Sequence, residues 1–512
     1  MSVLLRNFRK KFQSLAVLFF AIIFVVTKLP FIIDRTFVFQ FDHGKDSLAI
    51  LEMIVSRSPT LIGPWTSIPG LFFGPGWYYL LFPGYLLSSG DPASAVVTMI
   101  LLGLVQIFFV QKYFGLNAAI LVSTVPAFFS IAQSAWNPFP MTMVSFAILA
   151  VLKVLEKNKI LTIKKSLILG LFSSIGFHFS SAFAIFYPLF ILLSLLLKKI
   201  PFKLRHISIF LVALCFGFIP QVIFEFRHNF MQTRSIISYL NSQVGSDSGI
   251  VELWQIFGAS IGEYKLASLP NIFGASSMVS EIIFYFSLSS LLIGIFLMIK
   301  KRKALYLWQD ILIWTIFPLI IFWKLHFNLW YLLGIVPAVV IFTAQVLKNI
   351  PVFFRSIIII ALVMTPISKV FYYYNENRAE LLLSANMLSA KMLAYDFIIE
   401  NATGSAYSVY YYAPDIYDYP FQYIFFWQAY NGRPLPSEFS YKPGEDVYVK
   451  EKTSLLPAYQ ERNMLPAKIF FVVEYPKANE RLLQNWWNQQ AYGKILSEHK
   501  IGPDLTIYVA ES

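Results

Sequence analysis

The feature that most constrains this chain is the recurrence of long apolar runs through its first 372 residues. Each run holds roughly 17 to 25 residues, enough for a helix to cross a hydrocarbon layer of about 30 Å. Composition agrees, because 57% of the 512 residues are hydrophobic and only 13% are charged, whereas soluble domains are about a quarter charged. The sequence therefore predicts a polytopic α-helical membrane protein. Barrel strands would give short alternating segments instead.

The charge and cysteine content narrow the class further. The net charge of +13 would suit a nucleic-acid partner, but the basic residues stand in short clusters between apolar runs. Such clusters are typical of cytoplasmic loops, so we predict no nucleic-acid binding. The single cysteine, Cys215, excludes an intramolecular disulfide. No small-residue cleavage site follows the first apolar run, so we expect a retained helix rather than a signal peptide.

The basic clusters also predict how the chain crosses the membrane. Four basic residues lie within 6–11, and further clusters stand at 153–165, 198–205 and 300–303. The positive-inside rule places all of them in the cytoplasm, which requires an even number of crossings between the first two. Five apolar runs lie there. Run 70–88 contains six Gly and Pro residues that break helical hydrogen bonding, so we predict a re-entrant or juxtamembrane element.

This choice leaves about eleven spans in the plasma (inner) membrane of the cell envelope, with the N-terminus cytoplasmic. They are expected near 14–33, 93–113, 117–135, 139–155, 166–180, 182–197, 206–224, 281–299, 307–323, 329–348 and 352–372. Outer loops are expected at 34–92 and 226–280, which completes a membrane domain over 1–374. Beyond it, turn signals alternate with runs such as AKIFFVVEY. That pattern predicts a C-terminal extracytoplasmic soluble α/β domain over 375–512.

Ionisable and polar residues gather on the predicted outer face. Charged groups near membrane depth are costly, so each is a candidate functional residue. The candidates are Asp42, His43, Lys45, Asp46, Asn137, His178, Glu225, Arg227, His228, Lys324 and His326. The sequence lacks a GxxxxGK loop that would cradle a nucleotide phosphate on the cytoplasmic side. An enzyme with an outward-facing site would therefore take its activated group from a lipid carrier.

The stretch DHGKDS, residues 42–47, carries groups suited to such a transfer. Asp42 can accept a proton from an acceptor hydroxyl that attacks an anomeric carbon. Lys45, or a nearby His or Arg, can stabilise the departing phosphate. Structural alternatives stay open, because aspartates also favour helix N-termini and the aromatic residues of GPGWYYL can anchor at headgroup depth. The histidines and the cysteine show no metal-ligand spacing, so no zinc site is predicted.

These motifs resemble the GT-C superfamily of polyprenyl-phosphate-sugar-dependent glycosyltransferases, in its protein O-mannosyltransferase and aminoarabinose transferase branch. Such enzymes typically read Asp-Glu-x-Arg-Tyr-Ala where this chain reads DHGKDS, and their Pro-Pro-Leu-Tyr-Tyr-Trp element resembles GPGWYYL. The resemblance implies Asp42 as the catalytic base and Lys45 in place of the arginine, with His43 or Asp46 in the second polar position. It covers roughly residues 1–350, and the C-terminal domain matches no family pattern.

The same resemblance implies further roles along the outer face. Tyr78 and Tyr79 would surround the donor lipid, and Asn137 falls where relatives often carry a polar residue. His178 would lie near the lipid phosphate. The stretch FEFRHNF would open the loop that binds the lipid-linked donor, and its polar residues are Glu225, Arg227 and His228. A divalent cation, used by some relatives, stays open as a cofactor.

We therefore expect a membrane glycosyltransferase with Asp42 and Asp46 as catalytic residues. It would transfer a sugar from a polyprenyl-phosphate-linked donor to an extracytoplasmic lipid, glycan or protein. The alternative is a secondary transporter or lipid flippase, which would place charged groups in broken helices at the midplane and would usually lack a globular tail of about 140 residues. The polar clusters here sit mainly at outer helix ends, which favours the enzyme.

Overall fold

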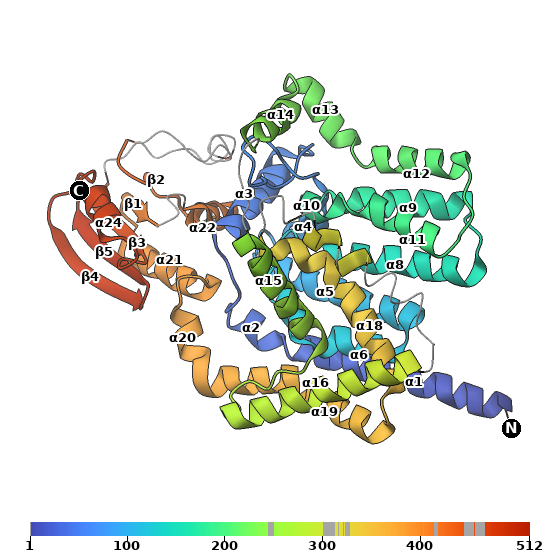
Figure 1. Cartoon of the computed structure of the whole chain (residues 1–512). Coiled ribbons are helices and arrows are strands. Elements are labelled where there is room, and N and C mark those ends of the chain that lie inside the picture. Colours follow the sequence, from blue (N-terminus) through green and yellow to red (C-terminus); the bar gives the residue numbers. More distant parts are fainter. Residues whose placement is uncertain are drawn as a thin grey trace.

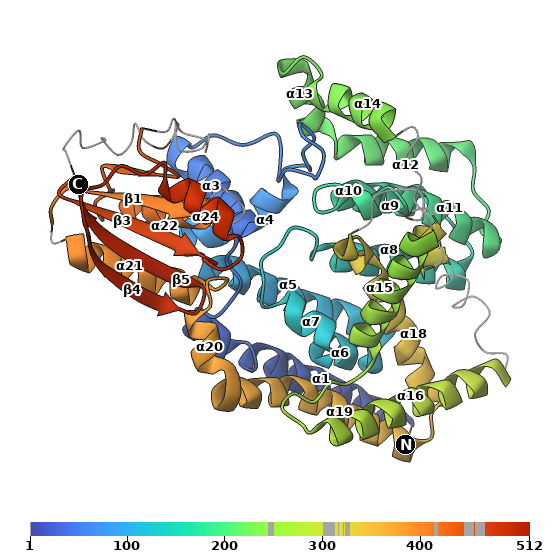
Figure 2. The same ribbon diagram turned by 60° about the vertical axis from the view of Figure 1, so that its left-hand side comes forward.

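A helical bundle and a C-terminal α/β domain lie side by side in this chain (Figures 1 and 2). The computed structural model describes residues 2–243, 250–300, 313–315, 317–320, 322, 328–402, 404–413, 418–444, 455 and 466–512. The N-terminus lies at the far end of the bundle from the sheet (Figure 1). The two parts are joined through helices that pack on both, and these helices position the site described below.

Within the described part of the chain, five helical segments are long and apolar enough to cross a membrane. They are Lys11–Ile33, Ala93–Phe114, Ser277–Lys300, Trp330–Asn349 and Val352–Leu383. A sixth candidate is the pair α12 (Leu204–Phe216) and α13 (Ile219–Arg227), bent by 55° at a short break. The predicted helical membrane-protein class is thus confirmed, while the count of eleven spans stays a prediction. Most of the predicted span 307–323 lies outside the described residues.

The long segments are made of the following elements. They are α1 (Ser2–Val26), α2 (Leu29–Ile33), α5 (Ala93–Phe114), α16 (Ser277–Lys300), η1 (Leu329–Ile335), α18 (Val336–Asn349), α19 (Val352–Tyr372), η2 (Tyr373–Asn377) and α20 (Arg378–Leu383). Other apolar runs form shorter helices, namely α6 (Leu116–Thr124), α7 (Pro126–Ile131), α8 (Met141–Asn158), α9 (Ile163–Gly176), α10 (Ser181–Ala184) and α11 (Tyr187–Leu197). Pro126 separates α6 from α7 because proline has no amide hydrogen to continue a helix.

The two segments predicted as outer loops each contain two helices. The first forms α3 (Phe41–Ser56) and α4 (Gly76–Leu87), and the second forms α14 (Met231–Gln243) and α15 (Ile250–Ser268). α4 has 12 residues, about 18 Å of helix, which is too short to cross the hydrocarbon layer. α15 packs against α7 and α18, with Ile256, Ser260 and Ala267 buried along one face. Part of the second segment therefore belongs to the bundle, because its helix carries an apolar stripe that needs covering.

The C-terminal domain is built on a five-stranded mixed sheet, as the predicted α/β class requires. Its strands are β1 (Tyr407–Tyr412), β2 (Glu438–Ser440), β3 (Lys468–Glu474), β4 (Ile495–Gly502) and β5 (Leu505–Glu511), in the order β2-β1-β3-β5-β4. β1 runs parallel to β2 and β3, and β5 runs antiparallel to β3 and β4. The helices are α21 (Leu388–Ala402), α22 (Tyr419–Tyr430) and α24 (Glu480–Trp487).

Both faces of β1 are covered, so all six of its residues are buried. Alternate side chains of a strand point to opposite faces. Tyr407, Val409 and Tyr411 join the large core that continues into the bundle, whereas Tyr410 and Tyr412 pack in a separate cluster with Trp486 of α24. A central strand covered on both sides explains why YSVYYY reads as a continuous aromatic and apolar run.

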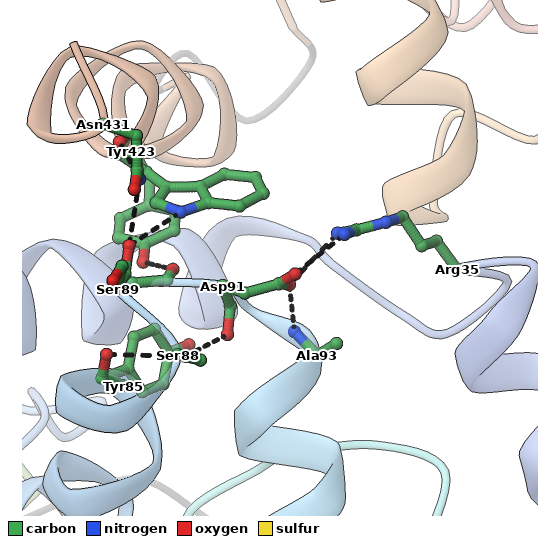
Figure 3. A network of polar contacts seen from close by, with 10 residues as sticks. Arg35, Tyr85, Ser88, Ser89, Asp91, Ala93, Tyr423 and Asn431 are labelled. Carbon is green, nitrogen blue, oxygen red and sulfur yellow. Dashed lines mark hydrogen bonds and ion pairs between the residues drawn. The ribbon is translucent and has the colours of Figure 1, made fainter.

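The domain docks on the turn between α4 and α5 (Figure 3). Arg35 forms a bidentate ion pair with Asp91, with N–O distances of 3.1 and 2.7 Å. Two side chains of α22 and that of its C-cap, Asn431, donate to backbone carbonyls of the turn: Tyr423 to Gly90, Trp427 to Ser89 at 3.1 Å and Asn431 to Ser89 at 3.0 Å. α22 also packs along α3. The docking therefore holds the α/β domain beside the N-terminus of α3.

Candidate active site

The candidate site begins at the N-terminus of α3. Gln40 has an extended backbone and its amide donates to His43 Nδ1 at 3.4 Å, so the histidine side chain completes a capping box. Asp42 lies in the first turn, where the helix dipole favours a negative charge. The capping interactions of Gln40 and His43 therefore begin α3 at the motif that carries Asp42 and Asp46.

Asp42 is held by two donors from different elements. Lys45 Nζ lies 3.0 Å from Oδ1, and Trp136 Nε1 donates to Oδ2 at 3.2 Å. Burial raises the pKa of this carboxyl, but the charge and hydrogen bond of Lys45 outweigh burial, so the pKa lies below its ordinary value. The side chain is 45% exposed. Asp42 is therefore ionised at neutral pH and accessible to a ligand.

Lys45 is the buried partner of this pair. The residue is 3% exposed, and its ammonium lies 5.2 Å from the ring centroids of both Phe41 and Trp65. Aromatic faces attract a cation at such distances. The rings and the Asp42 carboxylate therefore fix a positive charge beside the acidic group.

Two cavities meet at Asp42. The first, the bundle cavity, has a volume of about 690 Å³ and is lined mainly by apolar and aromatic residues of the helical bundle. The second, the domain cavity, has a volume of about 470 Å³ and lies between α3 and the α/β domain. Phe41, Asp42 and Trp136 line both. A ligand in either cavity can thus approach the same carboxylate.

The two cavities divide the neighbours of Asp42 between them. Lys45 and Asn137 line the bundle cavity, and His43 lines the domain cavity. The amide of Asn137 donates to the carbonyl of Phe179 at 2.7 Å. His43 Nε2 lies 3.0 Å from Ser134 Oγ, and burial lowers the pKa of His43 to about 4. His43 is therefore neutral at physiological pH and bonds as an uncharged imidazole.

Asp46 lies one helical turn beyond Asp42 and points elsewhere. It accepts hydrogen bonds from Trp77 Nε1 at 2.8 Å and from the Tyr78 hydroxyl at 3.3 Å. Burial raises the pKa of this carboxyl to about 7. The described linings of the bundle and domain cavities do not include it. Asp46 thus braces α3 against α4 through hydrogen-bond partners that differ from those of Asp42, although the nearby charge of Asp42 helps to raise its pKa.

Other residues that the sequence singled out also make structural contacts. The Tyr79 hydroxyl donates to the carbonyl of Thr60 at 2.7 Å. His178 Nδ1 accepts the amide of Gly76 at 3.1 Å, so its ring supports the turn that precedes α4. These side chains hold the Gly-rich segment in place, and the described linings of the two cavities do not include them.

The FEFRHNF group lies at the junction of α13 and α14. Glu225 accepts hydrogen bonds from the amides of Gln232 and Thr233 at 2.9 and 3.0 Å, and so satisfies the N-terminus of α14. The His228 ring stacks on Phe224 with centroids 3.9 Å apart, and Arg227 is exposed. The described linings of the two cavities include none of the three candidates. Lys324 and His326 lie outside the described residues.

Among the described residues, no cluster of three or more His, Cys, Asp or Glu side chains is placed to hold a metal ion. Asp42 and Asp46 accept hydrogen bonds from different partners.

Several site residues escaped the sequence reasoning. Trp136 belongs to the same turn as the candidate residue Asn137. No local sequence pattern predicts that its indole donates a hydrogen bond to Asp42. The domain cavity adds Lys391, Tyr411, Asp418 and Glu474. Lys391 and Glu474 form an ion pair across 83 residues of sequence. Their positions in strands and helices of a separate domain gave no spacing from which their proximity to Asp42 could be predicted.

Comparison with known proteins identifies the fold. No family model and no curated protein sequence matches the chain. Two solved structures of ArnT from Cupriavidus metallidurans do match. The apo structure is 12% identical over 98% of each chain, with a TM-score of 0.58. The structure bound to undecaprenyl phosphate is 12% identical over 97% of each chain, with a TM-score of 0.54. The chain has an ArnT-like fold.

ArnT is an aminoarabinose transferase of the GT-C superfamily. The predicted resemblance to that superfamily is therefore confirmed at the level of the fold. The match also extends further than expected, because it covers 97% or more of this chain and so includes the α/β domain. The resemblance predicted from sequence covered only residues 1–350, because the α/β domain carries no family motif that can be recognised in the sequence.

Proposed function

We propose that this protein is a membrane glycosyltransferase that uses a polyprenyl-phosphate-linked sugar as donor. The observation that carries the proposal is the position of Asp42, an ionised carboxylate with a fixed lysine beside it, where the apolar bundle cavity meets the domain cavity. The ArnT-like fold supports the same function. One of the two ArnT structures holds undecaprenyl phosphate, which makes a polyprenyl-phosphate carrier the natural donor class.

The bundle cavity suits the lipid-linked donor. Its walls include Phe73, Ile185, Phe186 and Leu189, and apolar walls of this kind favour a hydrocarbon chain by removing it from water. Lys45 lies where this lining meets Asp42. A fixed ammonium there would attract the donor phosphate and stabilise the negative charge that develops as the phosphate departs.

The reaction is a displacement at the anomeric carbon. An acceptor hydroxyl enters from the domain cavity, and Asp42 accepts its proton as the oxygen attacks. The bond between the anomeric carbon and the phosphate oxygen breaks, and the polyprenyl phosphate leaves with the bonding electrons. Attack from the side opposite the leaving group inverts the anomeric configuration. Asp42 alone serves as the base in this scheme, because Asp46 is engaged by Trp77 and Tyr78.

We further propose that the catalytic face is extracytoplasmic. In Figure 1 the N-terminus and the α8–α9 and α11–α12 connections lie at the end of the bundle opposite the sheet. The two connections contact each other, because Lys159 Nζ donates to the carbonyl of Lys198 at 2.8 Å and Lys198 pairs with Glu156. Basic clusters gathered at one end mark the cytoplasmic side. The site and the α/β domain then face outward.

The substitution Asp42→Asn tests the proposed base. Asparagine keeps the shape of aspartate but cannot accept the proton, and general-base catalysis typically supplies about 10²- to 10⁴-fold. We expect turnover of an undecaprenyl-phosphate-linked sugar by the protein in proteoliposomes, with cell-envelope material as acceptor, to fall at least 100-fold. Expression and thermal stability should be retained.

Asp46→Asn is the matched control, since it makes the same chemical change one turn away and should keep turnover within about threefold of wild type. An Asp42→Asn protein that folds and keeps more than about a tenth of wild-type turnover would remove Asp42 from the base role. Full activity with a nucleotide sugar and no lipid carrier would overturn the proposed donor class.

A further inference from the structure

The domain cavity lies at a recurrent ligand-binding position of the α/β fold. Its lining includes Tyr411 and Tyr412 at the carboxyl end of β1 and Glu474 at the carboxyl end of β3. β1 is flanked by β2 on one side and by β3 on the other. In open α/β sheets, ligands bind outside the carboxyl ends of parallel strands at such a switch point. Here that point faces Asp42.

A buried hydroxyl in this lining has no protein partner. Tyr411 is 2% exposed, and within the part of the chain that the structure describes its hydroxyl makes no hydrogen bond. A buried polar group left without a partner is destabilising. Burial, with the nearby charges of Asp418 and Glu474, raises the pKa of Tyr411 well above its ordinary value. The group therefore stays protonated and can donate to a ligand.

The charged groups of the cavity favour a neutral ligand over an anionic one. Of the described residues in the lining, Asp42, Asp418 and Glu474 are acidic and Lys391 is basic. Lys391 is buried and already paired with Glu474. His43 adds no positive charge near pH 7, because its pKa is about 4. The net negative lining would repel a phosphate, whereas carboxylates accept hydrogen bonds from sugar hydroxyls.

We propose that the domain cavity is the acceptor subsite and that it binds an uncharged sugar, with Tyr411, Asp418 and Glu474 exchanging hydrogen bonds with its hydroxyls. This assignment rests on the proposed glycosyltransferase function and specifies its acceptor class. A hydroxyl of the bound sugar would then lie toward Asp42, which lines the same cavity. The α/β domain thus contributes directly to acceptor selection.

Binding of simple glycosides without donor tests the assignment. The full-length protein in nanodiscs is titrated with neutral methyl hexosides and with the corresponding hexose 6-phosphates, and saturation-transfer NMR reports binding. We expect at least one neutral hexoside to bind, and its phosphate to bind at least tenfold more weakly. Tyr411→Phe and Glu474→Gln should each weaken binding about three- to tenfold, the usual effect of one lost hydrogen bond.

Tyr410→Phe provides the matched control. Tyr410 is the preceding residue of β1, faces α24, and donates to Glu438 at 2.7 Å on the far side of the sheet. It should leave glycoside binding unchanged. Equal binding of neutral and phosphorylated sugars, or equal effects of Tyr410→Phe and Tyr411→Phe, would overturn the acceptor assignment.

Kinetics separate this proposal from the proposed function. Slow hydrolysis of the undecaprenyl-phosphate sugar without acceptor reports the donor site alone. Tyr411→Phe should raise the KM for a neutral glycan acceptor with little change in kcat, so transfer at low acceptor concentration should fall more than donor hydrolysis does. If wild-type protein hydrolyses the donor but neither binds nor glycosylates neutral sugars, the acceptor assignment is wrong and the enzyme class stands. If it neither binds nor hydrolyses the donor, the enzyme class itself fails.

Discussion

Asp42 and Asp46 lie one turn apart on the same helix, yet their surroundings move their pKa values in opposite directions. Asp42 faces Lys45 and partial solvent, and its pKa is lowered. Asp46 is buried beneath Trp77 and Tyr78, two neutral donors, and its pKa is raised to about 7. Carboxyls whose pKa values are separated in this way take different roles. The geometry therefore gives the proposed base and the buried brace different surroundings.

The sequence could locate this acidic motif but could not assign its two members. Residues four apart share a helix face, so spacing alone placed both carboxyls in one site. The assignment depends on Trp77 and Trp136, which belong to other elements and reach the two carboxyls from different sides. Such contacts follow from tertiary packing and leave no local pattern.

The raised pKa of Asp46 predicts a pH dependence of stability. The pKa is about 7 in the folded chain, above the ordinary value of 3.8. Between about pH 4 and 7 the unfolded chain therefore releases this proton first, and this residue makes the free energy of unfolding decrease as pH rises through that window. Asparagine cannot ionise. We expect Asp46→Asn to lose less thermal stability than wild type between pH 5 and pH 8, as measured by scanning fluorimetry.

Asp42→Asn is the control for that measurement. Asp42 has a lowered pKa, so its contribution to stability is present above its ordinary pKa and is lost only as pH falls below about 4. Because the Asp42 charge helps to raise the pKa of Asp46, Asp42→Asn should reduce the stability change between pH 5 and pH 8 only in part, whereas Asp46→Asn removes the contribution of Asp46 altogether. Identical pH profiles for wild type and Asp46→Asn would show that Asp46 is ionised throughout, and would contradict its assignment as a buried brace.

At the scale of elements, glycines before α4 are required for packing as well as for breaking a helix. A Cβ on Gly76 would lie 2.8 Å from His178 Cβ, and one on Gly74 would overlap the His178 ring. The sequence predicted an interrupted element from the Gly and Pro content of 70–88. It could not show that His178, which follows α9, packs against Gly74 and Gly76 at this interruption.

This packing predicts a rescue. Gly74→Ala should destabilise the protein through the overlap with the His178 ring, and His178→Ala should cost about 1 to 2 kcal/mol through the lost hydrogen bond to the Gly76 amide. In the double variant the ring is gone and the alanine at 74 gains room, so the combined loss should be smaller than the sum. Denaturant unfolding measures the coupling. If His178 instead binds the donor phosphate, His178→Ala will raise the donor KM at least tenfold at full stability.

The helices themselves were partly predictable. Long apolar runs predicted α5, α16 and α19, because a helix in lipid needs a continuous apolar length. The same criterion gave no helix in 226–280, because Glu252, Glu263 and Lys265 interrupt the apolar sequence of α15. A long apolar run identifies a helix that crosses lipid. It does not identify a helix such as α15, which packs one face against neighbouring helices.

At the scale of the whole molecule, the candidate site exists only when the two parts of the chain are docked. Asp42 comes from α3, whereas Lys391, Tyr411 and Glu474 come from the α/β domain. The sequence predicted each part and its fold class. It could not predict that the carboxyl ends of β1 and β3 face the N-terminus of α3, because that arrangement depends on contacts between residues far apart in sequence.

The docking contact at Gly90 therefore predicts a functional defect at a distance. Gly90 has φ of +89°, and a Cβ there would lie 2.7 Å from Trp427 Cδ1 of α22. Gly432 has φ of +85°, but a Cβ there would meet nothing within 4 Å. Alanine at either position carries the cost of a left-handed backbone, about 1 to 2 kcal/mol. Only Gly90→Ala also displaces α22.

We expect both variants to lose similar backbone stability, while Gly90→Ala alone loosens the α/β domain. Limited proteolysis should then cleave the connection between α20 and α21 faster in Gly90→Ala than in Gly432→Ala. Because the domain supplies the acceptor side of the site, transfer to acceptor should fall several-fold more than donor hydrolysis, which depends on the bundle cavity. Parallel losses of transfer and hydrolysis, or equal behaviour of the two variants, would show that docking does not shape the site.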